Sequence, residues 1–261
     1  MKRVEAMNLS GLNEQFREAL KSRLEDLGLL EEKARFLTLD SNFVRLPSRE
    51  YALMRGKEFI EHCEVRGCCG QAFTDRPRET EMRLKDVLRL NLEDVTNRAL
   101  FFSALNAVMR LSGEVKRVIH CVKGEAEECG EVMAREILER YGRGVRVAHI
   151  GYQPSHVEAL SKLFKVYVTD MNPENVGKVK FGVRILDSSL NREVISKADV
   201  VLITGSSLIN NTLFELLDYC RRFRVPHLIY GITAIGVAKI MGLQVFCPFA
   251  HESMPEGWRD A

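Results

Sequence analysis

The sequence predicts an α/β protein in which a smaller α+β unit precedes a unit built on a mostly parallel sheet. From residue 145 onward short apolar segments alternate with helical ones, which requires parallel strands joined by crossover helices. Before that point, strands are followed by helices. The chain has 261 residues, enough for two domains of ordinary size, which we place at 1–114 and 115–261.

The composition excludes several classes of protein. Hydrophobic residues make up 46% and charged residues 28% of the chain, close to the averages of globular domains. The 38 basic and 36 acidic residues give a formal net charge of +2, too balanced to indicate a nucleic-acid or membrane-surface partner. No apolar run exceeds strand length, and Met1–Glu5 is not followed by the apolar core of a secretory signal. We therefore expect a soluble, cytoplasmic protein.

In the first half, a helix is expected from about Leu12 to Leu30, because apolar residues recur on one face. We expect an antiparallel pair from Phe36–Leu46 and Tyr51–Met54, followed by a loop over Cys68–Pro77. Two further helices are expected at 81–90 and 92–111, the second capped by Asn91.

The second half alternates regularly. After a helix at 125–141, strands are expected at 145–150, 166–169, 183–186, 198–204, 227–230 and 245–247. Helices are expected between them at 155–164, 213–223 and 232–241. Such alternation is typical of Rossmann-like domains.

The carboxyl ends of these strands are the predicted ligand site, because ligands of open parallel sheets bind there. Ser155 with Glu158, and Thr212 with Glu215, form capping boxes that mark helix N-termini able to hold an anion. The predicted ligand-binding residues are Gly151, Tyr152, Gln153, Pro154, Asp170, Asn172, Thr204, Gly205, Ser206, Asn210, Thr212, Gly231 and Thr233.

The role of Asp170 is open at this point. It follows Gly151 by 170 − 151 = 19 positions, the spacing at which dinucleotide-binding folds place an acid on a ribose hydroxyl. However, the first turn contains a single glycine, and the bulky Tyr152 and Gln153 would crowd a pyrophosphate. The alternative is that Asp170 only closes a turn. Likewise, the loop 204–212 is either part of a ligand site or an ordinary capped turn.

Several segments resemble the putative heavy-metal chelation family, a domain of unknown function. The run Thr-Gly-Ser-Ser-Leu-Ile-Asn-Asn-Thr at 204–212 is similar to that family's signature, with Thr204, Gly205, Asn210 and Thr212 at matching positions. The similarity extends through 150–154, 169–175, 230–236 and 246–249, and upstream through 70–74 and 97–107. It implies an N-terminal domain resembling the enolase N-terminal fold, a Rossmann-like domain, and a site in the cleft between them. Metal handling is the role that the resemblance implies.

Thiols and imidazoles are the natural ligands for a thiophilic transition metal. One group combines His62 and Cys63 with Cys68 and Cys69. The second combines His120 and Cys121 with Cys129, which lies near a helix start, where a thiol pKa is often lowered.

Cys247 follows a strand end, so the predicted metal ligands are Cys121, Cys129 and Cys247. The alternative is that these cysteines are small buried residues, as expected for Cys220. Among the histidines, we expect His149 in the interior of the sheet, whereas His156 could face a ligand.

The preferred hypothesis is a metal-homeostasis protein that binds a metal, or an anionic metal chelate, between its two domains. The alternative is an enzyme that uses an NAD-like nucleotide or S-adenosylmethionine at the Rossmann-like crevice. A scaffold without a small ligand is a third hypothesis, and a homodimer is left open. No Walker loop or H-E-x-x-H motif is present to define a reaction class, so whether the chain is an enzyme stays open.

Overall fold

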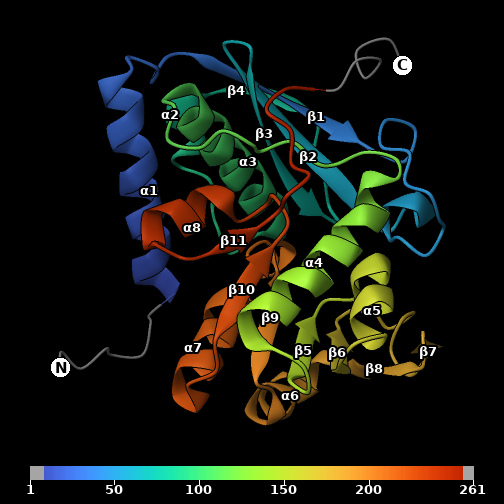
Figure 1. Ribbon diagram of the computed structural model, residues 1–261. Coiled ribbons are helices and arrows are strands. Elements are labelled where there is room, and N and C mark those ends of the chain that lie inside the picture. The colour runs from blue at the N-terminus through green and yellow to red at the C-terminus, as the bar shows by residue number, and fades with distance from the viewer. Residues whose placement is uncertain (1–8, 255–261) are drawn as a thin grey trace.

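Two sheets organise the structure, a computed structural model that describes residues 9–254 (Figure 1). The smaller sheet is antiparallel, in the order β3-β2-β1-β4, and is formed by β1 (Lys33–Leu39), β2 (Phe59–Val65), β3 (Cys68–Thr74) and β4 (Thr80–Arg83). The larger sheet has seven strands in the order β11-β10-β9-β5-β6-β8-β7, of which only β7 runs antiparallel. The predicted α/β class with a mostly parallel sheet and a smaller α+β part is confirmed.

The larger sheet is doubly wound. Its strands are β5 (Arg146–Ile150), β6 (Lys165–Asp170), β7 (Val179–Lys180), β8 (Val183–Asp187), β9 (Val200–Thr204), β10 (His227–Tyr230) and β11 (Val245–Phe246). Successive strands are added on one side of β5 and then, from β9 onward, on the other. The order therefore reverses between β5 and β9, the point at which ligands of such sheets bind.

Helices cover the two sheets. They are α1 (Leu9–Asp26), α2 (Leu84–Val87), α3 (Val95–Leu111), α4 (Glu125–Tyr141), α5 (Pro154–Ser161), α6 (Asn191–Lys197), α7 (Leu213–Phe223) and α8 (Ile235–Met241). Short 3₁₀ turns lie at η1 (Leu53–Arg55), η2 (Ser188–Leu190) and η3 (Gly205–Ser207). Within residues 9–254 no helix combines the length and apolar character needed to cross a bilayer.

The hydrophobic core is shared between the two sheets. On one face of the parallel sheet, α4 and α5 bury Met133 and Leu160 against strand residues such as Leu202. The other face belongs to a larger cluster that also contains α1, α3 and the small sheet. Within it, the ring of Phe16 from α1 lies 5.9 Å from Phe102 of α3 and 5.8 Å from Phe214 of α7. The two halves of the chain are thus packed into one another.

The elements predicted for the second half agree closely with the structure. Helices α4 and α7 and strand β10 have the predicted bounds, and the other predicted elements are present with ends shifted by a few residues. The short strand β7 and the helix α6 were not predicted. The central strands β5 and β9 are buried on both faces and therefore consist of nearly continuous apolar runs, a pattern that is easy to recognise.

Several predictions for the first half are wrong. Tyr51–Met54 forms a turn and the start of η1, and β1 pairs instead with β2, a strand that was not predicted. The expected loop at Cys68–Pro77 is mostly β3. The helix expected at 81–90 begins as β4, and α3 is capped by Asp94, whose carboxylate accepts from the N–H of Asn97. Both faces of β2 and β3 are covered, so polar and small residues lie inside and the usual alternation is lost.

Helix α3 lies directly against β3. An ideal Cβ on Gly70 would lie 2.2 Å from the backbone nitrogen of Ala107 and 2.3 Å from the carbonyl oxygen of Ser103. Real Cβ atoms do not approach backbone atoms so closely, because protein interiors are close-packed and repulsion is steep at these distances. Glycine is therefore required here by space.

Asn106 of α3 connects the small sheet to the parallel one. Its side-chain nitrogen donates to the carbonyl oxygens of Gln71, at 3.0 Å, and Thr233, at 3.1 Å. Its side-chain oxygen accepts from the backbone N–H of Gly236 at 2.9 Å. All three hydrogen bonds are buried, where an unsatisfied partner is costly.

We predict that Gly70→Ala destabilises the protein by about 2 kcal/mol or more, because the methyl group forces α3 away from β3. Gly11→Ala is the matched control: Gly11 lies in α1 with no atom near the position of an added Cβ, so helix propensity should stabilise it by about 0.5–1 kcal/mol. Urea denaturation measures both. Equal stability of the two variants would contradict the close contact.

Asn106→Ala is predicted to cost about 2–4 kcal/mol, because it removes three buried hydrogen bonds and leaves their partners unsatisfied. The Gly236 amide should also exchange with solvent deuterium faster than its neighbours in α8. Asn13→Ala, in partly exposed α1, serves as the control and should change stability by less than about 0.5 kcal/mol. Unchanged protection of Gly236 would rule out the bridging role of Asn106.

Candidate functional site

The ends of β5, β9 and β10 meet at the point where the strand order reverses. Gly151 has a φ of +88°, and an ideal Cβ there would lie 2.8 Å from Cγ2 of Thr204 and 3.1 Å from the hydroxyl of Tyr230. That hydroxyl donates to the carbonyl oxygens of Ile150, at 3.0 Å, and Gly151, at 2.8 Å. Glycine at 151 is therefore required by backbone conformation and by the packing of the strand ends.

Asp170 joins the loops that follow β5 and β6. Its carboxylate accepts from the backbone N–H groups of Tyr152 and Asn172, both at 2.6 Å. Burial raises the pKa of Asp170, while these two hydrogen bonds oppose the rise. The side chain of Asn172 in turn accepts from the N–H of Glu174 at 2.9 Å. Turn closure, one of the two alternatives for Asp170, is thus a role that it performs.

The small sheet brings a second carboxylate to these strand ends. Glu58, just before β2, is half-buried, and burial followed by the charge of Asp170 raises its pKa to about 7. A hydrogen bond with Ser206 opposes that rise. Nearby, Arg55 donates to the side-chain oxygen of Asn175 at 3.2 Å. The sequence offered no signal for Glu58 or Arg55, because both lie outside any motif and the local strand prediction was wrong.

The polar loop 204–212 mostly satisfies its own backbone. Thr204 accepts from the N–H of Ser206 at 3.3 Å, and the hydroxyl of Ser207 donates to the carbonyl of Thr204 at 2.6 Å. Arg98 of α3 donates to the carbonyl of Ile209 at 2.5 Å, which attaches the loop to the N-terminal half. Asn210 is exposed, and no contact described for it joins it to Gly151 or Asp170.

The two predicted capping boxes are wrong. The N-cap of α5 is Gln153, whose side-chain oxygen accepts from the N–H of His156 at 2.6 Å. Pro154 occupies the first helical position, so Ser155 already lies inside the helix, where its hydroxyl bonds to the carbonyl of Ala126. Thr212 precedes α7 with near-helical backbone angles and makes no capping hydrogen bond.

The turn after β10 contacts both the small sheet, through Thr233, and a predicted metal ligand, through Gly231. The hydroxyl oxygen of Thr233 accepts from the N–H of Phe73 at 3.0 Å. Gly231 makes a backbone hydrogen bond to the thiol of Cys247. This turn therefore connects the strand ends to a predicted metal ligand.

The three cysteines predicted as metal ligands come together from separate segments. Cys121 lies between α3 and α4, Cys129 in α4, and Cys247 just after β11. Burial raises the pKa of Cys121 well above its ordinary value, and Cys247 and Cys129 raise it further. Burial raises the pKa of Cys247 to about 12, with a contribution from Cys129. These three residues are the thiol cluster.

The expectation of a lowered thiol pKa at Cys129 is wrong. The helix start favours a thiolate, but burial in apolar surroundings disfavours the charged form and raises the pKa of Cys129 to about 12. At neutral pH the thiol cluster is therefore protonated.

Two buried histidines adjoin Cys129. The Sγ atom of Cys129 lies 3.3 Å from Nε2 of His156, and Nδ1 of His156 lies 3.3 Å from Nε2 of His149. Nδ1 of His149 lies 2.7 Å from the carbonyl oxygen of Gly151. Burial lowers the pKa of His149 to about 4 and that of His156 well below its ordinary value. A chain of neutral groups thus links the thiol cluster to the end of β5.

Only part of the other predicted group, which combined His62, Cys63, Cys68 and Cys69, can offer metal ligands together. Its members His62 and Cys69 are joined by Glu64, which was not predicted. Ligand atoms of His62, Glu64 and Cys69 lie within 4.8 Å of one another on one face of β2 and β3. Cys63 belongs to the core on the opposite face, among residues of α3. Nδ1 of His62 lies 3.1 Å from the side-chain nitrogen of Gln71, whose oxygen accepts from the N–H of His120 at 2.8 Å.

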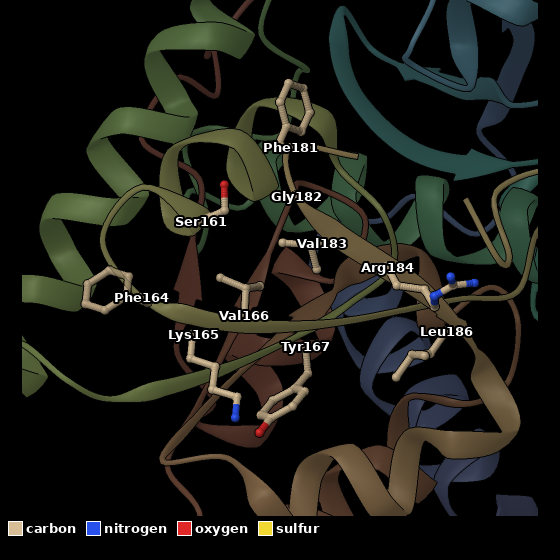
Figure 2. Close-up of a pocket in the computed structure, with 10 residues that line it drawn as sticks. All are labelled: Ser161, Phe164, Lys165, Val166, Tyr167, Phe181, Gly182, Val183, Arg184 and Leu186. Atoms are coloured by element: carbon tan, nitrogen blue, oxygen red, sulfur yellow. The ribbon is translucent and has the colours of Figure 1, made fainter. Parts of the chain in front are cut away.

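A shallow depression lies elsewhere on the parallel sheet. It has a volume of about 500 Å³ and is lined by the end of α5, the start of β6 and the turn before β8 (Figure 2). Lys165 and Val183, the first residues of β6 and β8, place it at the amino ends of these strands. None of the predicted ligand-binding residues lines it.

Comparison with known proteins agrees with this architecture. A sequence model of the family described as putative heavy-metal chelation, DUF364, matches residues 134–242. A DUF364 structure of unknown function from Pyrococcus horikoshii is similar with a TM-score of 0.51 and 18% identity, covering 84% of this chain and 79% of that chain. Another from Desulfitobacterium hafniense DCB-2 has a TM-score of 0.52 and 14% identity, covering 89% and 85%. No curated protein matches the chain.

At such identities the two structures show a shared fold and nothing about ligands. The resemblance read from the sequence is nevertheless confirmed: the model of the putative heavy-metal chelation family matches residues 134–242, and members of that family share the fold of this chain.

Proposed function

We propose that the protein binds one thiophilic divalent metal ion at the thiol cluster of Cys121, Cys129 and Cys247. The observation that carries the proposal is the convergence of three thiols from three separate segments. Cys247 and Cys129 raise the pKa of Cys121, and Cys129 raises the pKa of Cys247. Thiolates favour zinc and the softer transition metals, so the chemistry of the donors fits such an ion.

The thiol cluster joins segments that lie far apart in the sequence. Cys121 belongs to the segment that joins the two sheets, and Cys247 to the segment that returns over the small sheet, where His251 pairs with Ile119 (Figure 1). Among the described residues, three donor atoms lie within 4.8 Å of one another only at His62, Glu64 and Cys69, so the three sulfur atoms of the thiol cluster, taken together, are farther apart than this. The thiol cluster therefore has to contract when the ion binds, and binding would tie the two segments to α4.

The name of the family supports the proposal only in general terms, because it refers to heavy-metal chelation without naming ligands. The alternative, an enzyme that uses a nucleotide cofactor, has less support. The Asp170 carboxylate, which would have to bind the ribose hydroxyls, already accepts hydrogen bonds from two backbone N–H groups. The Tyr230 hydroxyl and the Thr204 side chain pack against Gly151, where a pyrophosphate would have to approach the backbone.

We expect the purified full-length chain to bind one equivalent of Zn²⁺ or Cd²⁺ and to gain thermal stability from it. Cys121→Ser, Cys129→Ser and Cys247→Ser should each weaken binding at least about tenfold, since each removes one thiolate ligand. Cys68→Ser, a partly exposed thiol outside the cluster, is the control and should bind as the parent does. Calorimetric titration measures affinity and stoichiometry.

An outcome in which all four variants bind equally would reject the thiol cluster as the site. The same thermal-shift assay with NAD, ATP and S-adenosylmethionine tests the alternative function. A shift with any of these that Asp170→Ala abolishes would favour a nucleotide-dependent enzyme.

Metal affinity should rise with pH. The raised pKa values keep the thiols of the cluster protonated between pH 6 and 8, so the metal must displace protons to bind. Each displaced proton increases the apparent affinity by up to about tenfold per pH unit, without levelling off in this range. Competition with a chelator at pH 6, 7 and 8 measures the slope, and a pH-independent affinity would contradict thiol ligation.

A further inference from the structure

Resting on the proposed metal site, we propose that His156 is a fourth ligand, binding through Nε2 beside Cys129, and that His149 is the positioning residue that holds it in the ligating tautomer. The sequence indicated only that His156 could face a ligand, and it placed His149 in the interior of the sheet.

The hydrogen bonds of the histidine chain determine where the protons lie. The carbonyl oxygen of Gly151 can only accept, so Nδ1 of His149 carries a proton and donates to it. The Nε2 atom of a neutral His149 is then an acceptor, and Nδ1 of His156 must donate to it. Nε2 of His156 is left with a lone pair, which faces the thiol of Cys129. No carboxylate lies among the described hydrogen-bond partners of either ring.

This arrangement is the one that a metal-binding histidine requires. Ligating histidines donate their second ring N–H to a fixed acceptor, which sets the tautomer and the ring orientation. His149 supplies that acceptor, and the backbone of Gly151 in turn fixes His149. The hydrogen bond to His149 already fixes the orientation of the His156 ring. Metal binding therefore loses little additional side-chain conformational entropy.

The distance between the two donors also suits a shared ion. Zinc–sulfur and zinc–nitrogen bonds of about 2.3 and 2.0–2.1 Å at a tetrahedral angle separate the two ligand atoms by about 3.6 Å. The Sγ of Cys129 and Nε2 of His156 lie 3.3 Å apart. A shift of a few tenths of an ångström therefore replaces one S–H···N hydrogen bond by two bonds to the metal, and the thiol proton leaves to solvent. Once Cys121 and Cys247 move closer to this pair, the donor set becomes Cys₃His, a common set for zinc.

The His62 group fails the same test. Because the Gln71 side-chain oxygen accepts from a backbone N–H, its nitrogen is the group that faces His62, and Nδ1 of His62 must accept from it. A neutral His62 then carries its proton on Nε2, the atom 3.5 Å from the Glu64 carboxylate. Its lone pair points away from Glu64, so three close donor atoms here do not make a ready ligand set.

The test is a Co²⁺ titration of the full chain, followed by the thiolate-to-metal charge-transfer band and the visible ligand-field bands. His156→Phe should weaken Co²⁺ binding at least about 100-fold and alter the ligand-field bands, since a ligand is lost. His149→Phe should weaken it about 10- to 100-fold with the charge-transfer band retained, as for loss of an outer-shell partner. His227→Phe is the control: His227 is the first residue of β10, at the end of the strand away from the proposed site, and this variant should bind as the parent does.

The outcomes separate this inference from the proposed function. If Cys129→Ser loses binding but His156→Phe keeps both affinity and spectrum, the thiol site stands and His156 is not a ligand. If the parent protein gives no thiolate charge-transfer band, or if Cys69→Ser alone removes it, both proposals fall.

A measurement on metal-free protein keeps the inference testable should His156→Phe fail to fold. Nitrogen-15 chemical shifts should report the Nδ1–H tautomer for both His149 and His156. A proton on Nε2 of His156 would overturn the ligand assignment whatever the titration shows.

Discussion

The structure depends on the direct contact between α3 and β3. At Gly70 the two backbones approach so closely that no side chain fits, and at Asn106 the same helix is bonded both to β3 and to the turn after β10. This contact holds the small sheet against the carboxyl ends of the parallel strands. Glu58 then lies near Asp170, and Thr233 can bond to the backbone of Phe73.

Burial controls the chemistry of the groups that this packing encloses. It keeps the thiol cluster protonated although Cys129 lies near a helix start, because the loss of hydration outweighs the helix dipole. It also keeps His149 and His156 neutral, so that each ring has one donor and one acceptor. A hydrogen-bonded chain with a defined direction results, running from Cys129 to the carbonyl of Gly151. The assignment of His156 as a metal ligand depends on that direction.

Sequence reasoning worked where one physical pattern dominated. Strands such as β9 are buried on both faces and flanked by helices, so apolar runs and helical periods locate them. It failed in the small sheet, because β2 and β3 bury Glu61, His62 and Gln71 through hydrogen bonds that a linear pattern does not reveal. The capping boxes failed for a similar reason: Gln153 reaches the free N–H groups of α5 before Ser155 can.

The sequence by itself determined the fold class, the alternation of the second half, the family resemblance and the three cysteines of the proposed site. Each of these is written in local composition or in motifs. Only the tertiary structure decided that Cys121, Cys129 and Cys247 are neighbours, that Glu58 approaches Asp170, and that His156 presents a lone pair. These properties depend on contacts between segments that are distant in the sequence and on which hydrogen-bond partners a buried group finds there. No single position of the chain encodes such contacts or partners.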